Sequence, residues 1–429
     1  MCRNRADDAS VLDPPRPLSL SAVVAGIISA LVNYSGPFLI VLEAARAAGL
    51  DAAQTASWVW AVSIGNGVCC IALSLFTRMP IIVACSTPGA ALLIASIGGF
   101  SFGEAVGAFF AASVLAAICG FTGWFGWILA RVPAPVLQAL LAGILLPFVI
   151  QAATAFESAP LLAGSVLAAY FLGKRWLDRY AVPLALLAGV VVAALTGSFG
   201  EITGGLALTA PVFTMPVFSP AALISIGLPL FIVTMASQNA PGLALLRSEG
   251  YEPDDRLLVG GISTVSALLA PFGNHAINIA ALTAAIATGP DSHPERSRRY
   301  IAGLFAGIVY LLVGIFGGTI VAAFQAIPSA TMTALAAVAL LASTLSSLTG
   351  AVSGGPRSGV ASLATIAVTM SGVVLLGVGS AFWGLIAGTA VWFILAPRRA
   401  ARRAARTTVQ REPRARARAS SWGRHRRCG

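Results

Sequence analysis

Long apolar runs recur through almost the whole sequence and constrain the fold more than any other feature. Many of them reach about 20 residues, the length that a helix needs to cross the hydrocarbon core of a bilayer. Only 10% of the residues are charged, whereas soluble domains carry about 25%. The sequence therefore predicts an all-α polytopic membrane protein and excludes a soluble globular domain.

The apolar runs divide the chain into about fourteen transmembrane segments. The predicted segments are 18–45, 55–77, 80–98, 103–130, 133–156, 158–173, 181–197, 219–246, 256–269, 271–289, 299–324, 328–350, 358–376 and 378–396. The remaining parts are predicted to be a cytoplasmic N-terminal segment (1–17), an extracytoplasmic loop (198–218) and a disordered Arg-rich cytoplasmic tail (397–429).

The basic side chains support this map. Twelve Lys and Arg residues lie between the two terminal segments, and with both termini in the cytoplasm only Arg46 falls outside a cytoplasmic connection. The positive-inside rule predicts such an asymmetry. Adding or losing one span would destroy it, so the pattern favours an even number of spans and cytoplasmic termini in a multi-pass membrane protein.

The tail carries the net charge of the chain. It holds twelve Arg and a single acidic residue, Glu412, and so accounts for the formal charge of +11. Because it follows an apolar span directly, we expect it to meet anionic lipid and not nucleic acid. The six Cys residues show no metal-binding spacing, so we expect small buried side chains, no disulfide, no metal and no cofactor.

Fourteen segments divide into two halves of seven, residues 18–197 and 219–396. Because seven is odd, a duplicated half enters the membrane in the opposite orientation, as in inverted-repeat transporters. Stretches 80–98 and 271–289 each begin with Pro and end with Gly, and they start 191 residues apart. The sequence therefore predicts seven-plus-seven inverted repeats in which these two stretches correspond.

Spans three and ten carry the pattern of interrupted helices. Residues 81–84 are mostly β-branched, and Ser86, Thr87 and Pro88 follow. Thr87 suits an N-cap and Pro88 a first helical position, so a half-helix would begin within the membrane, with Asn278 as the corresponding N-cap in span ten. Free N–H groups at such helix starts suit an anion. A Pro kink in a packed helix is the alternative.

Span ten also contains an ionisable residue, His275, within the predicted membrane. An intramembrane ionisable group is a functional-site hypothesis by default, and His exchanges protons near neutral pH. We therefore predict a proton-coupling role for His275. A neutral His bonded to a carbonyl is the alternative. Glu43, one turn before Arg46, is expected to form an interfacial ion pair.

Further polar residues lie next to Pro in spans one and eight. Gln238 and Asn239 precede Pro241, and Tyr34 precedes Pro37. We expect each Pro to break its helix and to free a backbone carbonyl. Amides within lipid are costly unless they face a cavity or one another, and helix–helix hydrogen bonding is the alternative. The candidate substrate-binding residues include these groups and the aromatic and amide residues that flank them in spans one and ten. They are Tyr34, Ser86, Thr87, Gln238, Asn239, Phe272, Asn274 and Asn278.

Four stretches together resemble the benzoate:proton symporter family (BenE). These are Ser-Trp-Val-Trp-Ala at 57–61 with Gly65, Ser-Thr-Pro-Gly-Ala-Ala-Leu at 86–92, Ser-Gln-Asn-Ala-Pro-Gly at 237–242, and Asn-His-Ala-Ile-Asn-Ile-Ala-Ala-Leu-Thr-Ala-Ala-Ile at 274–286. The resemblance implies a bacterial inner-membrane importer of benzoate-like acids. It also implies a fold like that of nucleobase and sulfate transporters, with core and gate subdomains. Relatives often carry an acidic residue in span eight or ten, which this chain replaces by amides and His275.

The predicted function is uptake of a small aromatic carboxylate together with a proton by alternating access. The carboxylate would lie near Ser86, Thr87 and Asn278, with Tyr34 and Phe272 flanking the ring. A nucleobase or inorganic-anion transporter of the same fold and an anion channel are the alternatives. No set of nucleophile and base appears, so an enzyme is not expected, and a homodimer stays open.

Overall fold

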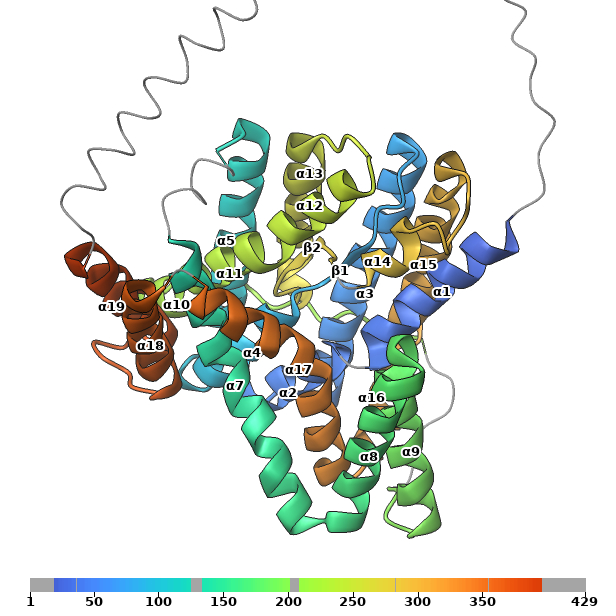
Figure 1. Cartoon of the computed structure of the whole chain (residues 1–429), viewed down its shortest axis with the longest axis horizontal. Coiled ribbons are helices and arrows are strands. Elements are labelled where there is room, and N and C mark those ends of the chain that lie inside the picture. The colour runs from blue at the N-terminus through green and yellow to red at the C-terminus, as the bar shows by residue number, and fades with distance from the viewer. Residues whose placement is uncertain are drawn as a thin grey trace, which may run out of the picture.

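The computed structural model describes residues 19–35, 37–124, 133–200, 208–281, 283–353 and 355–395 (Figure 1). The predicted N-terminal segment (1–17) and the Arg-rich tail (397–429) both lie wholly outside the described residues. Within them, eight helices are long and apolar enough to cross a membrane, and shorter apolar helices add to these. The fold class predicted from the sequence is confirmed.

The elements follow one another in chain order. They are α1 (Leu20–Ser35), α2 (Pro37–Ala47), α3 (Ala52–Thr77), β1 (Val83–Cys85), α4 (Thr87–Ser96), η1 (Ile97–Gly99), α5 (Phe102–Thr122), α7 (Ala134–Ser158), α8 (Pro160–Trp176), η2 (Asp178–Tyr180), α9 (Ala181–Leu195), α10 (Pro220–Ala222), η3 (Leu223–Gly227), α11 (Leu228–Thr234), η4 (Met235–Asn239), α12 (Ala240–Ser248), α13 (Asp255–Leu269), η5 (Ala270–Phe272), β2 (Ile277–Ile279), α14 (Ala284–Thr288), η6 (Arg296–Arg298), α15 (Tyr300–Ile315), α16 (Gly317–Gln325), α17 (Ser329–Val352), α18 (Pro356–Met370) and α19 (Ser380–Leu395).

The helices pack in two groups, which form the predicted core and gate. In the core, α3 packs against α15, α5 against α13, and α1 against α15. In the gate, α7 packs against α17 and α18, α8 against α9, and α18 against α19. Small residues permit the close approach that membrane helices use. A Cβ added at Gly120 of α5 would lie 2.4 Å from the backbone nitrogen of Gly260 in α13.

Spans three and ten are both broken by extended chain, as predicted. Strands β1 and β2 pair antiparallel at the middle of the molecule (Figure 1), with Ala84 opposite Asn278. The backbone N–H of Ser86 donates to the carbonyl of Ala276 at 3.0 Å and extends the pairing toward α4. Both strands are fully buried, so their mutual hydrogen bonds provide what extended backbone at membrane depth requires.

Spans one and eight each contain a Pro that is predicted to break the helix. In span one, helical residues extend from Leu20 to Ser35 (α1) and from Pro37 to Ala47 (α2), but position 36 between them lies outside the described residues, so the break there stays a prediction. Span eight continues through two π-helical turns, η3 and η4, and Pro241 lies at the start of α12. A π-turn accommodates an extra residue without ending the helix, so this span is bulged and the predicted break there is wrong.

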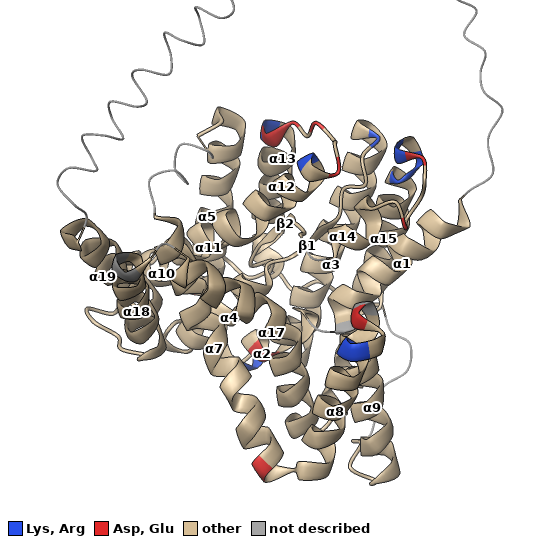
Figure 2. Ribbon diagram, viewed as in Figure 1, with Lys and Arg blue, Asp and Glu red and all other residues tan. Residues whose placement is uncertain are grey.

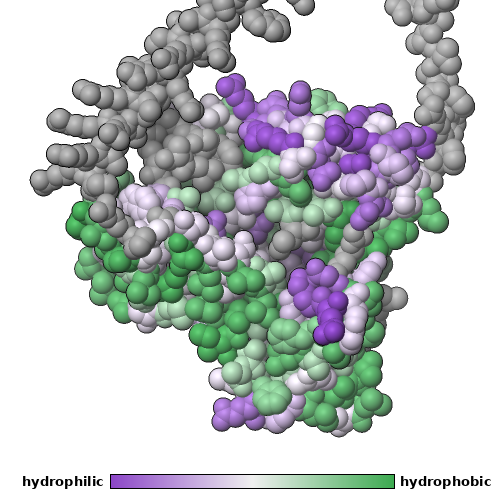
Figure 3. All heavy atoms as spheres, viewed as in Figure 1, coloured by the Kyte–Doolittle hydropathy of each residue, from purple (hydrophilic) through white to green (hydrophobic). Residues whose placement is uncertain are grey.

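Charged side chains gather at one edge of the core, where α3 and α12 end and α13 and α15 begin (Figure 2). Arg247 pairs with Asp255 at 2.5 Å, and Arg299 with Glu249 at 3.5 Å. Hydrophobic side chains cover much of the remaining visible surface (Figure 3). The separate ion pair predicted between Glu43 and Arg46 is confirmed at 2.7 Å.

The start of α3 is fixed by a capping box, which allows a first prediction. The Asp51 carboxylate accepts from the backbone N–H of Gln54 at 2.7 Å, and the Gln54 side chain accepts from the backbone N–H of Asp51. Asp51→Ala should lower the free energy of unfolding by about 1 kcal/mol, since a helix N-terminus loses its acceptor. Thermal unfolding in detergent measures the loss. Asp51→Asn keeps the acceptor and should match the unaltered protein; equal loss in both variants would contradict the capping role.

Candidate functional site

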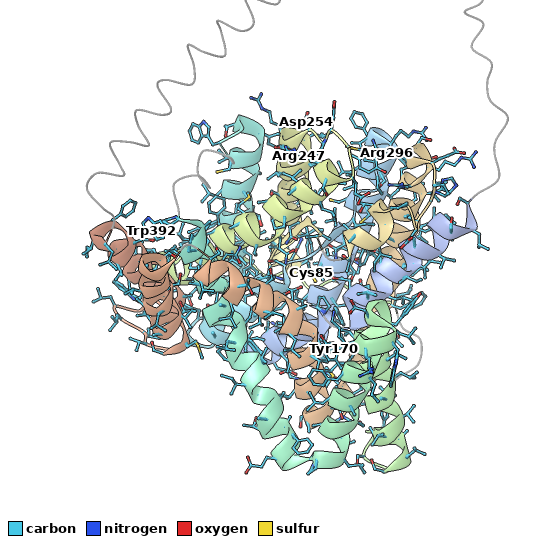
Figure 4. All side chains as sticks on the ribbon, in the orientation of Figure 1. Cys85, Tyr170, Arg247, Asp254, Arg296 and Trp392 are labelled. Atoms are coloured by element: carbon cyan, nitrogen blue, oxygen red, sulfur yellow. The ribbon has the colours of Figure 1, made fainter. Side chains whose placement is uncertain are left out.

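The two broken spans meet at a joint in the middle of the molecule, where Cys85 ends β1 (Figure 4). Ser86 follows at once with extended backbone, and its hydroxyl accepts from the N–H of Gly89 at 3.1 Å. Ser86 is therefore the N-cap of α4, and Thr87 and Pro88 are its first two helical residues. The predicted N-cap at Thr87 is wrong by one position, because β1 runs directly into the cap.

The second half-helix begins later than the 191-residue correspondence predicts. Asn278 lies in the middle of β2, opposite Ala84, and α14 begins only at Ala284, with Thr283 in the N-cap position. The predicted N-cap role of Asn278 is therefore wrong. The physical reason is the strand pairing, which holds Asn278 in extended chain and delays the restart of the helix.

His275 connects the two halves of the joint. The indole Nε1–H of Trp58 donates to His275 Nδ1 at 3.1 Å, and His275 Nε2 lies 3.1 Å from the carbonyl oxygen of Ser86. Because Nδ1 accepts, Nε2 must carry the proton and donate to that carbonyl. The ring is fully buried. This bonding fits the neutral imidazole, in which both ring nitrogens have partners.

Two buried amides at the joint have no protein partner. Neither polar atom of the Asn274 side chain, and neither of Asn278, has a hydrogen-bond partner among the described residues, and both side chains are fully buried. Asn274 lies close to α3, where a Cβ added at Gly65 would be 3.5 Å from its Nδ2. An unsatisfied buried polar group costs about 1–3 kcal/mol, so these four atoms favour a polar ligand or water at the joint.

The other predicted amide residues divide between structure and site. Asn239 is buried, and its Oδ1 accepts from the backbone N–H of Ile279 at 3.1 Å while its Nδ2 lies 3.5 Å from the sulfur of Met235. It therefore ties span eight to β2. Gln238 is half-buried on η4, and Thr87 is half-buried in the first turn of α4.

The two predicted aromatic residues lie in separate clusters. The Tyr34 hydroxyl donates to Ser63 at 2.7 Å, and its ring packs 5.6 Å from that of Tyr310. Phe272 packs against Trp60 and against Phe213 in the loop after α9, with ring centroids 5.6 and 5.8 Å apart. The structure thus gives each ring a packing role, and their contact with a ligand stays a prediction.

Several residues of the joint were not among the predicted site residues. Trp58 is fully buried and bonds His275, Thr234 lies 3.3 Å from the Ser86 hydroxyl, and Ser266 accepts from the N–H of Ile277. Thr283 is buried, and its hydroxyl has no hydrogen-bond partner among the described residues. The sequence carried a signal for Trp58, which lies in the stretch 57–61 of the family resemblance, and for Thr283, a capping residue type ahead of an Ala-rich stretch.

A cavity of about 290 Å³ separates α4 from the gate. Its walls are largely apolar, and its polar groups include Ser96 of α4, Gln151 of α7 and Thr369 of α18. The Thr369 hydroxyl has no hydrogen-bond partner among the described residues. Neither the cavity nor the joint points to a metal, because no group of three or more His, Cys, Asp or Glu residues forms in the described part of the chain.

The fold is similar to that of two solved transporters. The chain is similar to the transmembrane domain of a cyanobacterium bicarbonate transporter, BicA, at 17% identity and a TM-score of 0.58, covering 86% of this chain and 97% of that one. It is also similar to the murine anion transporter Slc26a9 in its inward-facing state, at 14% identity and a TM-score of 0.62, covering 92% and 73%. At these identities the likeness concerns the fold.

Sequence relatives are more specific. The chain is 38% identical to the inner membrane protein YdcO of Escherichia coli over 373 residues. This alignment covers 87% of this chain and 95% of the relative. It is 34% identical over 377 residues to a benzoate membrane transport protein of Acinetobacter baylyi, covering 88% and 95%. The BenE family, described as benzoate membrane transport protein, matches residues 16–394. The chain therefore belongs to the BenE family, and it is a membrane transporter and not an enzyme.

Proposed function

We propose that this transporter imports benzoate or a similar aromatic carboxylate, together with a proton, by alternating access of the core relative to the gate. The observation that carries the proposal is the pair of buried amides at the joint, Asn274 and Asn278, whose polar atoms have no hydrogen-bond partner in the described part of the chain. Amide N–H groups donate to carboxylate oxygens, and a hydrogen bond to a charged group contributes about 1.5–3 kcal/mol.

The start of α4 supports a monoanion at the same place. The first turn of a helix carries about half a positive charge, and α4 begins immediately after β1, beside the buried amides. Thr87 in that turn and Gln238 on η4 are half-buried and offer further polar groups. Ser86 and Asn239 already bond the protein, so we assign them to shaping the site.

Proton coupling is part of the proposal, and His275 is its predicted carrier. In the described arrangement a proton arriving at Nδ1 must first displace the indole N–H of Trp58, which donates to that nitrogen at 3.1 Å. Coupling through His275 therefore requires a second arrangement of the joint in which this bond is broken.

The family relatives also support a location. We propose that the protein lies in the bacterial inner membrane with both termini in the cytoplasm, on the same side as the charged edge of the core. The Arg-rich tail would then meet anionic lipid. A homodimer is compatible with this arrangement, because the gate leaves large apolar side chains such as Trp176 exposed.

Uptake of labelled benzoate into proteoliposomes under an imposed inward proton gradient tests the function. We expect saturable uptake that exceeds uptake without a gradient and falls when a protonophore collapses it. Unlabelled benzoate should compete, whereas uracil and sulfate should not. Competition by uracil or sulfate alone would support a transporter for a nucleobase or an inorganic anion, and a non-saturating current would support a channel; either result overturns the proposal.

A further inference from the structure

A second cavity, of about 140 Å³, lies between the core and the gate, and we call it the Lys174 chamber. Its core wall includes Pro37, where α2 begins, and Thr283, ahead of α14. Its gate wall includes Tyr170 and Lys174 of α8, and Asp178 of η2. Figure 4 labels Tyr170 on this part of α8.

Four side chains supply the polar groups of the Lys174 chamber, namely Tyr170, Lys174, Asp178 and Thr283. The Lys174 ammonium forms an ion pair with the Asp178 carboxylate. The Thr283 hydroxyl, on the opposite wall, is buried and has no hydrogen-bond partner among the described residues. Valine and alanine side chains of α9 and α17 form much of the remaining wall. A cation, a free hydroxyl and apolar walls match the two ends of an aromatic carboxylate.

Stability does not account for the pair of Lys174 and Asp178. Both side chains are half or more exposed, at 50% and 67%, and such pairs contribute about 0–1 kcal/mol. Lys ahead of an acidic residue at this spacing is also the less favourable order on a helix. Asp178 lies beyond the end of α8 at Trp176, where a negative charge opposes the helix dipole.

We propose that the Lys174 chamber is a second carboxylate site, in which the carboxylate of the transported acid replaces Asp178 as the partner of Lys174 and accepts a hydrogen bond from Thr283. This inference rests on the proposed function. Because its two walls belong to the core and to the gate, the site is complete only when the subdomains lie as they do here. Asp178 acts as a built-in competitor that promotes release of the acid.

Two substitutions with opposite expected signs test the chamber. Equilibrium binding of labelled benzoate to the purified full-length protein gives the Kd. Lys174→Met should weaken binding about 10-fold, and Asp178→Asn should strengthen it several-fold, because the competing carboxylate is gone. Benzamide, a neutral analogue of the same shape, should respond to neither substitution. Thr283→Val should weaken benzoate binding, and Thr283→Ser should restore it.

The controls separate the chamber from a structural ion pair and from the proposed function. Glu43→Gln breaks an ion pair of α2 outside the chamber and should leave the Kd unchanged. If Lys174→Met and Asp178→Asn both weaken binding, or neither alters it, the chamber proposal is overturned while the proposed function stands. If the unaltered protein binds no benzoate, both fail. If Lys174→Met does not fold, Asp178→Asn alone decides through the sign of its effect.

Discussion

Replacing Asn278 by leucine should abolish benzoate uptake and leave a folded protein that is more stable in the absence of substrate. The side chain is fully buried in β2, and both of its polar atoms lack a hydrogen-bond partner among the described residues. Leucine has a similar size and no polar atom to satisfy. Losing an amide donor to a carboxylate removes about 1.5–3 kcal/mol, so we expect benzoate affinity to fall about 100-fold.

The rise in stability has a separate physical cause. Each unsatisfied buried polar group costs about 1–3 kcal/mol, and Asn278→Leu removes two such atoms. Thermal unfolding without substrate should therefore occur at a higher temperature, and added benzoate should raise that temperature less than it does in the unaltered protein. Both readouts come from the same purified protein, so loss of function cannot be attributed to loss of folded material.

Asn239 provides the matched control. It is also a buried asparagine in the core, but its Oδ1 accepts from the N–H of Ile279 at 3.1 Å. Asn239→Leu leaves that N–H without an acceptor and should lower stability by about 1–3 kcal/mol. If Asn278→Leu destabilises the protein as Asn239→Leu does, then Asn278 has an unrecognised structural partner and is not a substrate residue.

The sequence was most informative about where the helices break in spans three and ten. β-branched residues followed by Ser, Thr and Pro favour an extended segment and then a helix start, and the structure contains β1 and then α4 at this place. The repeated Pro and Gly of span ten similarly predicted β2. These signals are local, since each depends on backbone preferences of a few neighbouring residues.

The residues at which the helices restart after the breaks in spans three and ten could not be predicted, because their positions depend on tertiary contacts. Ser86 and Thr87 are both good capping residues, and the choice of Ser86 follows from its backbone bond to Ala276. Asn278 lies as far after Pro271 as Thr87 lies after Pro80, and this equal spacing predicted a helix start at Asn278. Pairing with Ala84 holds Asn278 in a strand instead. Similarly, Pro241 predicted a break in span eight, and two π-turns absorb it instead.

The partners of the site residues were even less accessible from the sequence. Trp58 and His275 are 217 positions apart, and Lys174 shares a cavity with Thr283 only because the gate packs on the core. From the sequence, the positive-inside rule accounted for Lys174 as one of the basic residues that flank a span on the cytoplasmic side. A residue type can suggest chemistry, but the groups that complete it are fixed by helix packing.

His275→Ala should be among the most destabilising single substitutions at the joint. It removes the acceptor of the buried Trp58 indole N–H and leaves a cavity where the fully buried imidazole packs near Phe109, with ring centroids 6.4 Å apart. The Ser86 carbonyl keeps a donor, the N–H of Ala90 at 2.8 Å. The unsatisfied indole and the cavity together should lower the free energy of unfolding by about 2–4 kcal/mol.

His275→Gln distinguishes a structural connection from a proton carrier. A glutamine amide can donate to the Ser86 carbonyl and accept from Trp58, so it should recover much of the stability that alanine loses. A double-mutant cycle with Trp58→Phe should give a coupling energy of about 0.5–3 kcal/mol, as expected for residues in direct contact. A coupling energy near zero would show that the bond between Trp58 and His275 contributes little to the joint.

The same glutamine variant tests coupling, because it cannot take up a proton in this pH range. In the described arrangement both nitrogens of the neutral imidazole are hydrogen-bonded, because Nδ1 accepts from Trp58 and Nε2 donates to the Ser86 carbonyl. Protonation of Nδ1 would therefore place its N–H against the indole N–H of Trp58. Because the proposal has His275 carry the proton after the bond from Trp58 opens, we expect folded His275→Gln to take up benzoate without responding to the inward proton gradient. If uptake by this variant depends on the gradient as it does in the unaltered protein, the imidazole is not the proton carrier.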